Sequence, residues 1–318
     1  MTATQKALGT RPSWFTRFWA IVRYEMLWNI RKKKFLGIIV IAFVLASLGL
    51  VLPAILSSTT GTAITENSNF AITYGASSFG FFLFALATAM NSISSEFESG
   101  TIVPLLTKPV SRTMVFLGKL FAALIIILIS YVIIFTYTTV GSFFVFGPQN
   151  SLELVPLVLL GNLISTFIWV SILLAMGSLT KNTILTALAA LGLFLALFIA
   201  LPVVSVFAGP SASLNYFPGS GASGAMEINN MTLPISTGTD NLGVNLVYAI
   251  LYPSANVTFS KIDIQAIEAG ETTLPTSEIL YSEPTGLVAL RALGIAFAYI
   301  LVFLFIAWLA FKRSQILE

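Results

Sequence analysis

Residues 154–207 read LVPLVLLGNLISTFIWVSILLAMGSLTKNTILTALAALGLFLALFIALPVVSVF, two long apolar runs separated only by Thr180, Lys181 and Asn182. An α-helix needs about 20 apolar residues to cross a bilayer core that is roughly 30 Å thick, and each run exceeds that length. The polar link between them has room only for a tight turn. The stretch therefore predicts a hairpin of two transmembrane helices, 154–179 and 183–207.

The composition of the whole chain also indicates a membrane protein. Of 318 residues, 57% are hydrophobic and only 9% are charged, and the mean hydropathy is +0.92. A soluble domain carries roughly 25% charged residues, so this chain cannot coat a surface that faces water. Four further apolar runs are long enough to span a bilayer, 35–56, 70–92, 114–146 and 286–311. Together with the hairpin they make six predicted crossings.

The positions of the charges predict the orientation. Six crossings place both termini on one side, and every basic residue except Lys261 and Arg291 flanks that side. Cytoplasmic loops are enriched in Lys and Arg, so both termini should be cytoplasmic in a multi-pass protein of the cytoplasmic membrane. Lys119 and Arg291 fall just inside crossings, where long basic side chains usually extend towards the headgroups. A net charge of +3 gives no indication of nucleic-acid binding.

Two segments outside the six crossings have their own character. Residues 1–34 include a stretch, 13–34, with Trp14, Phe18, Ile21 and Trp28 on one helical face, which predicts a helix lying at the headgroup level. Glu25 interrupts that face. We expect residues 208–285, which are rich in Gly, Ser and Thr, to form an extracytoplasmic segment.

This outer segment contains two apolar stretches, 242–252 and 262–267. It is too short, without disulfides, to be stable alone, so it should pack on the helices or on a second copy. Asn230 and Asn256 begin glycosylation sequons within it. Helix 286–311 and a cytoplasmic tail, 312–318, complete the predicted all-α membrane fold.

Several kinds of chemistry are excluded by residue type. The chain has no cysteine and no histidine, so disulfides, thiol catalysis and imidazole metal sites are absent. It also lacks the G-x-x-x-x-G-K-[ST] loop whose backbone holds ATP phosphates. We therefore predict no catalytic, metal-binding or cofactor-binding residue in this chain. If ATP drives the protein, another chain binds it.

The predicted cytoplasmic stretch between the second and third crossings has an unusual pattern. Residues 94–112 read SSEFESGTIVPLLTKPVSR. Gly100 permits a reversal, Thr101 is a good N-cap and Pro109 stops a helix, so 101–107 should be a short helix. Ile102, Leu105 and Leu106 share one face of it, and an apolar face in the cytoplasm indicates a protein partner. The alternative is a merely solvated loop, in which Ser95 and Glu98 form a capping box.

The same stretch resembles a known family. The acidic pair, Gly100-Thr101, Leu105-Leu106, the block 109–112 and Leu117-Gly118-Lys119 are similar to the permeases of the ABC-2 family of ABC transporters, most of all to the branch named for multicopper-enzyme maturation. The resemblance implies six helices after an amphipathic N-terminal helix, and a short cytoplasmic helix that docks on an ATP-binding subunit. The docking residues that follow are Glu96, Glu98, Gly100, Thr101, Ile102, Leu105, Leu106, Lys108, Pro109 and Arg112.

The function expected from the resemblance is that of a permease subunit of an ABC exporter. Two copies of the ATPase, which bind ATP and Mg²⁺, would pair with two permease copies in the lipid membrane. The crossings carry almost no charge, which favours apolar cargo. Two alternatives stay open at this point: a secondary transporter or channel, which needs ionisable groups inside the membrane, and a non-transporting scaffold that presents the outer segment.

Overall fold

The computed structural model describes residues 13–31, 33–60, 68–73, 78–100, 110–228, 231–262 and 276–313. Among these residues, five helices are long and apolar enough to cross a membrane. They are α2 (Lys33–Thr60), α7 (Arg112–Phe146), α8 (Val155–Thr180, preceded by the 3₁₀ turn η1, Leu152–Leu154), α9 (Thr183–Phe207) and α12 (Thr285–Arg313). The predicted class, a helical membrane protein, is confirmed.

The second predicted crossing, 70–92, is described only in part, because residues 74–77 lie outside the described residues. Its described parts are α3 (Phe70–Thr73) and α4 (Ser78–Ala89), and neither is long enough to cross a bilayer. Within α4, Phe81 and Phe82 are fully buried in the main core.

The main core is built around α8. Trp169 is 1% exposed and lies edge-on to Phe82 of α4 and to Phe194 of α9. Buried hydroxyls on α8 donate to carbonyls of its own backbone, as Ser178 does to Leu174, which satisfies polar groups away from water. Helix α12 packs along α8, and Tyr131 of α7 shares a hydrogen bond of 2.6 Å with a threonine of α8.

The turn between α8 and α9 explains the hairpin. Lys181 adopts the left-handed conformation with φ 53°, and the side chain of Asn182 accepts a hydrogen bond from the Leu185 N–H at 2.9 Å. The Asn182 cap satisfies an N–H in the first turn of α9, which would otherwise have no acceptor. Most of α9 is exposed, as expected of a helix that faces lipid.

The outer segment is not purely helical. It contains an antiparallel sheet in the order β2-β1-β3-β4, formed by β1 (Ser223–Ile228), β2 (Met231–Ser236), β3 (Asn256–Ile262) and β4 (Thr276–Pro284). The apolar stretch 242–252 becomes helix α10 (Leu242–Leu251) between β2 and β3, whereas 262–267 contributes only the last residue of β3 and otherwise lies outside the described residues. The small sheet adds to the predicted helical class, and short strands rich in Gly, Ser and Thr gave no clear pattern in the sequence.

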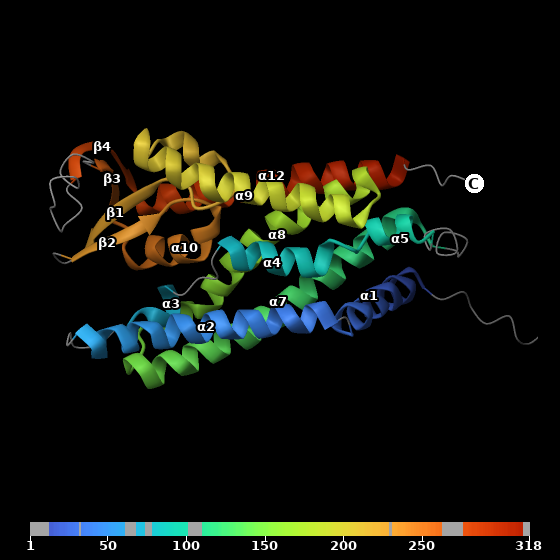
Figure 1. Cartoon of the computed structure of the whole chain (residues 1–318), viewed down its shortest axis with the longest axis horizontal. Coiled ribbons are helices and arrows are strands. Elements are labelled where there is room, and N and C mark those ends of the chain that lie inside the picture. Colours follow the sequence, from blue (N-terminus) through green and yellow to red (C-terminus); the bar gives the residue numbers. More distant parts are fainter. Residues whose placement is uncertain are drawn as a thin grey trace, which may run out of the picture.

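The sheet packs on the transmembrane helices. One apolar cluster joins Met226, Val257 and Phe259 of the strands to Leu201 of α9 and Val288 of α12. Asn256 is exposed at the start of β3, and Asn230 lies outside the described residues. In Figure 1 the sheet and α10 occupy one end of the molecule, and α5 (Ser94–Glu98) lies at the other.

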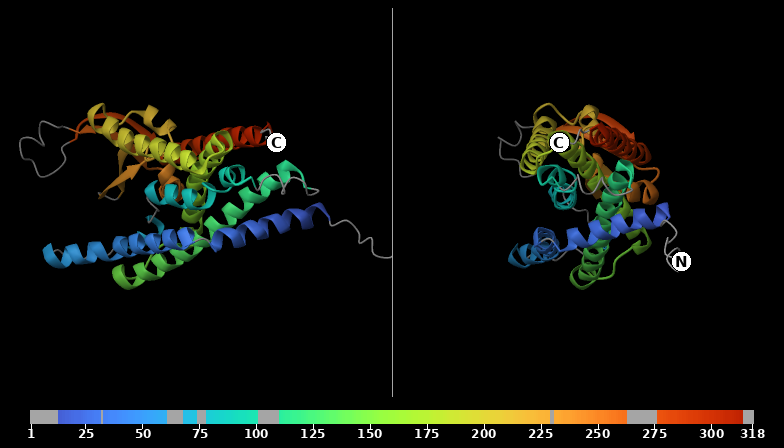
Figure 2. Two further views of the ribbon diagram at one scale, coloured as in Figure 1. Left: turned by 45° about the vertical axis from the view of Figure 1, so that its right-hand side comes forward. Right: turned by 90° about the vertical axis from the view of Figure 1, so that its right-hand side faces the viewer.

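At the end of the molecule where α5 lies, elements from distant parts of the sequence lie close together. Helix α1 (Trp14–Ile30), the start of α7 and the end of α12 all reach it. The two turned views in Figure 2 keep α1 beside the first turns of α7, and the two helices are in contact. The described residues thus form a sheet-bearing end and an opposite end where α1 begins and α12 ends.

Candidate functional site

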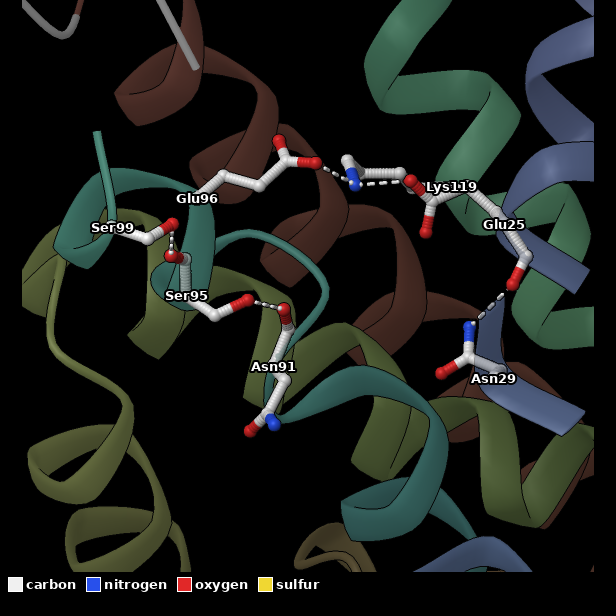
Figure 3. Close-up of polar contacts among 7 residues, drawn as sticks. All are labelled: Glu25, Asn29, Asn91, Ser95, Glu96, Ser99 and Lys119. Carbon is white, nitrogen blue, oxygen red and sulfur yellow. Dashed lines mark hydrogen bonds and ion pairs between the residues drawn. The ribbon is translucent and has the colours of Figure 1, made fainter. Parts of the chain in front are cut away.

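Helix α5 is held at its start by serine hydroxyls. Ser94 donates to the Met90 carbonyl at 2.6 Å and Ser95 to the Asn91 carbonyl at 2.5 Å, so both close back on the turn before α5 (Figure 3). The N-cap position is Ile93, which has no side-chain cap. The capping box considered for Ser95 and Glu98 is therefore wrong, because Ser95 lies inside α5 and the N-cap position is Ile93.

A buried ion triad joins α5 to two other helices. The Nζ of Lys119 on α7 lies 2.6 Å from the Oε1 of Glu25 on α1 and 2.6 Å from the Oε1 of Glu96 on α5 (Figure 3). The Lys119 side chain is 2% exposed, that of Glu25 is 8% and that of Glu96 is 19%. Buried charges occur in proteins when they are paired and hydrogen-bonded in this way.

The triad corrects one expectation from sequence. Lys119 does not extend to the headgroups, because both carboxylates enclose its ammonium group inside the protein. It is the eighth residue of α7, so it lies about 10 Å along the axis from the start of a helix whose 35 residues span about 52 Å. That length exceeds a bilayer core by about 20 Å, so the first turns of α7 have room to lie outside it.

The face of the N-terminal helix α1 that packs against the protein is not the face that the sequence predicted. Its buried residues are Phe18, Val22, Glu25 and Asn29, whereas Trp14 and Trp28 are about half exposed. Glu25 therefore lies in the packed face, not in an interruption of it. Asn29 donates from its amide to the Glu25 carbonyl at 3.0 Å. The one sequence signal for the triad was this acidic residue among apolar neighbours.

Further contacts tie α5 to the α8–α9 turn and to α12. The Oε2 of Glu98 accepts a hydrogen bond of 3.2 Å from the N–H of Thr183, the first residue of α9. A carboxylate at this position is stabilised by the positive N-terminal end of the helix dipole. Phe97 lies edge-on to Phe311 of α12 at 6.0 Å between ring centroids, and the Lys181 ammonium lies over the Phe97 ring at 5.5 Å. Sequence reasoning gave no sign of these contacts.

The predicted docking residues divide into two groups. Thr101, Ile102, Leu105, Leu106, Lys108 and Pro109 lie outside the described residues. Gly100 has a φ of 68°, as a reversal after α5 requires. Arg112 begins α7 and donates to the Lys312 carbonyl at 3.0 Å, and both Glu96 and Glu98 have partners inside the chain. The segment 101–109 is therefore flanked by two anchored elements.

The other basic residue inside a crossing also has a carboxylate partner. Arg291 of α12 lies 2.7 Å from Glu283 of β4, and both side chains are largely buried. The expectation that Arg291 extends to the headgroups is wrong as well, since the pair binds the sheet to the start of α12. This pair lies at the opposite end from the Lys119 triad (Figure 1).

A cavity lies between the helices and the outer segment. Its volume is about 220 Å³, and Trp169, Phe194 and Pro202 contribute apolar walls. Asp240, 4% exposed, lines it from η3 (Thr239–Asn241), the turn before α10. Ser165 donates to the Thr239 carbonyl at 2.6 Å and so fixes this turn against α8. The walls suit an apolar molecule better than an ion.

Comparison with known proteins identifies a family. The model of a family described as ABC-2 family transporter protein matches residues 19–316. No curated protein matches the chain at a significant level.

Proposed function

Because the chain belongs to the ABC-2 family of transporter proteins, we propose that it is the permease subunit of an ATP-binding cassette exporter in the cytoplasmic membrane. The observation that carries the proposal is the family match across almost the whole chain. In this proposal the permease dimerises, and two ATPase subunits bind at the end that holds α5. The narrower similarity to the multicopper-enzyme maturation branch stays a prediction from residues 96–119.

The distribution of charge supports a cytoplasmic location for the α5 end. Arg112, Lys181 and Lys312 lie there, whereas Lys261 and Arg291 lie with the sheet. Positive residues are retained on the cytoplasmic side of a membrane. An ATPase in the cytoplasm would therefore meet α5 and the segment 101–109, and the sheet would face the outside.

Coupling follows from the way this segment is held. An ATPase pair that closes on ATP can change the permease only by favouring one of two arrangements, and it acts through whatever it touches. Residues 101–109 connect α7, which crosses the membrane, to α5, which is bonded through Glu96 to Lys119 of α7 and through Glu98 to Thr183 of α9. Movement of a docked segment would thus reach the bundle through α5 and through the first turn of α7.

The cargo class follows from the lining that the chain can offer. The long helices expose mainly apolar side chains, and the cavity beside Trp169 is mostly apolar. We propose a lipid-like, peptide or otherwise hydrophobic substrate. A secondary transporter would need a titratable group near the middle of a crossing, whereas Lys119 lies near the start of α7.

Substitution of the apolar docking face tests the proposal. Leu105→Glu should leave insertion intact but weaken binding of an ATP-binding-cassette subunit encoded beside this chain by about 100-fold, since an unpaired charge buried in an interface costs several kcal/mol. Glu98→Ala should weaken binding less than about tenfold, because charges at the rim of an interface contribute less. Co-purification of the full complex and its ATP hydrolysis rate measure both effects.

The opposite end supplies matched controls. Leu152 of η1 is 45% exposed and Glu227 of β1 is exposed, so Leu152→Glu and Glu227→Ala repeat the same chemical changes far from α5. Both should bind the ATPase as the parent chain does. Full ATPase binding by Leu105→Glu would show that this segment is not the docking element. Substrate movement that needs an ion gradient but no ATP would support the secondary transporter instead.

A further inference from the structure

The Lys119 triad contains one carboxylate more than a simple ion pair needs. Glu25 and Glu96 both place an Oε1 atom at 2.6 Å from the same ammonium group, in a site where little water enters. Two carboxylates brought this close repel each other, and each is desolvated by burial. A chain that needed only to neutralise Lys119 would keep one of them.

The contact of α1 with α7 is extensive and apolar. Phe18 and Val22 of α1 form a buried cluster with Met114 and Ala122 of α7. At Gly118 the two helices approach so closely that an added Cβ would meet the Cγ2 of Ile21 at 2.6 Å. Glu25 and Lys119 therefore belong to one packed unit, and their ion pair moves only if that unit comes apart.

The contact of α5 with this unit is different. Helix α5 has five residues, of which only Ser94 is buried. Glu96 is more exposed than Glu25, and the exposed Ser99 and Gly100 lead directly into the segment 101–109. An element of five residues, with one buried residue and one aromatic contact, Phe97 against Phe311, has the least packing to lose and separates first under load.

We propose that the triad is a latch in which the Glu96–Lys119 pair opens and closes as α5 moves, and in which Glu25 is the positioning residue that lets it open. When Glu96 leaves, Lys119 keeps Glu25, so no buried ammonium group is stranded. When Glu96 returns, it shares a cation that Glu25 has already neutralised. This inference deepens the proposed function and rests on it for the source of the force on α5.

The latch predicts opposite effects for two similar substitutions. In Glu96→Gln, α5 loses its ionic hold and should separate more often. In Glu25→Gln, Lys119 depends on Glu96 alone and opening would strand its charge, so α5 should separate less often. A triad that merely stabilises the fold predicts the same direction for both, because each substitution removes one ion pair of 2.6 Å.

Thiol labelling of Ser94 measures the opening without any ATPase. Ser94 is 0% exposed and the chain has no cysteine, so Ser94→Cys gives one buried thiol that reacts only when α5 lifts. In membranes that contain the full chain, Glu96→Gln should raise the labelling rate by about tenfold or more, and Glu25→Gln should lower it. Glu283→Gln breaks the Arg291 pair at the other end and should change nothing.

The ATPase complex supplies the second measurement. Glu96→Gln should retain ATP hydrolysis but lose its stimulation by substrate, and Glu25→Gln should slow turnover while the ATPase stays bound. Lys119→Arg, which keeps the positive charge, should retain more of the stimulated ATP hydrolysis than Lys119→Met. Faster labelling in both carboxylate variants would overturn the latch. Absence of ATPase binding by the parent chain would overturn the proposed function, and the labelling arm would still decide the latch.

Discussion

At the scale of single residues, the contact between α8 and α10 depends on two glycines. A Cβ built on Gly161 would lie 2.2 Å from the Cα of Gly243, a distance at which the backbones must move apart. Gly161→Ala should therefore lower the free energy of unfolding by about 1–3 kcal/mol, as over-packing of a close contact does. Thermal unfolding of the purified chain in detergent measures the change.

Gly192 of α9 is the matched control for this prediction. No atom lies within 4 Å of a Cβ added there, so Gly192→Ala should leave stability unchanged or raise it slightly, by up to about 1 kcal/mol. If Gly161→Ala unfolds at the same temperature as Gly192→Ala, the close approach of α8 and α10 is not needed for stability.

The ion pairs show what a sequence conceals at this scale. Lys119 read alone is a basic residue near the end of an apolar run, which is typical of an anchor at the headgroups. Its partners stand 94 and 23 residues away in the chain, so no local pattern links them. Glu25 was visible as an anomaly on an apolar face, but its partner becomes apparent only when α1 and α7 are packed together.

At the scale of elements, hydropathy predicts long helices well and short ones poorly. The runs that became α7, α8, α9 and α12 are dictated by length and composition. The strand order β2-β1-β3-β4 is not, since it depends on which distant segments meet. Strand β1 pairs with β2 next to it and with β3 about 30 residues later, a choice that no periodicity encodes.

The burial of α10 gives a prediction for the outer segment. Tyr248 of α10 is 8% exposed, whereas Tyr216 of η2 (Ala212–Tyr216) is 60% exposed. Limited digestion of the native chain by chymotrypsin should cut after Tyr216 and spare Tyr248, because cleavage requires local unfolding of the backbone. Mass spectrometry of the early fragments identifies the sites. Equal cleavage at both tyrosines would mean that α10 is not packed against α8 and α12.

At the scale of the whole molecule, the two ends differ in charge and in architecture. The sheet end carries Arg291 with Glu283 on β4, and the α5 end carries the basic turns, the start of α1 and the end of α12. The charge difference was predictable, because the positions of Lys and Arg can be read directly from the sequence. The meeting of α1, α5, α7 and α12 at one end was not, since it requires the packed arrangement in Figures 1 and 2.

The polarity leads to a test of orientation in living cells. Ser99 is exposed after α5, and Ser254 is exposed in the turn between α10 and β3, so each accepts cysteine with little change of shape. The parent chain has no cysteine and supplies the blank. If basic residues keep the α5 end in the cytoplasm, an impermeant thiol reagent should label Ser254→Cys in intact cells and Ser99→Cys only after the membrane is opened. The reverse pattern would place the segment 101–109 outside, where no ATPase could reach it, and would remove the physical basis for ATP-driven coupling.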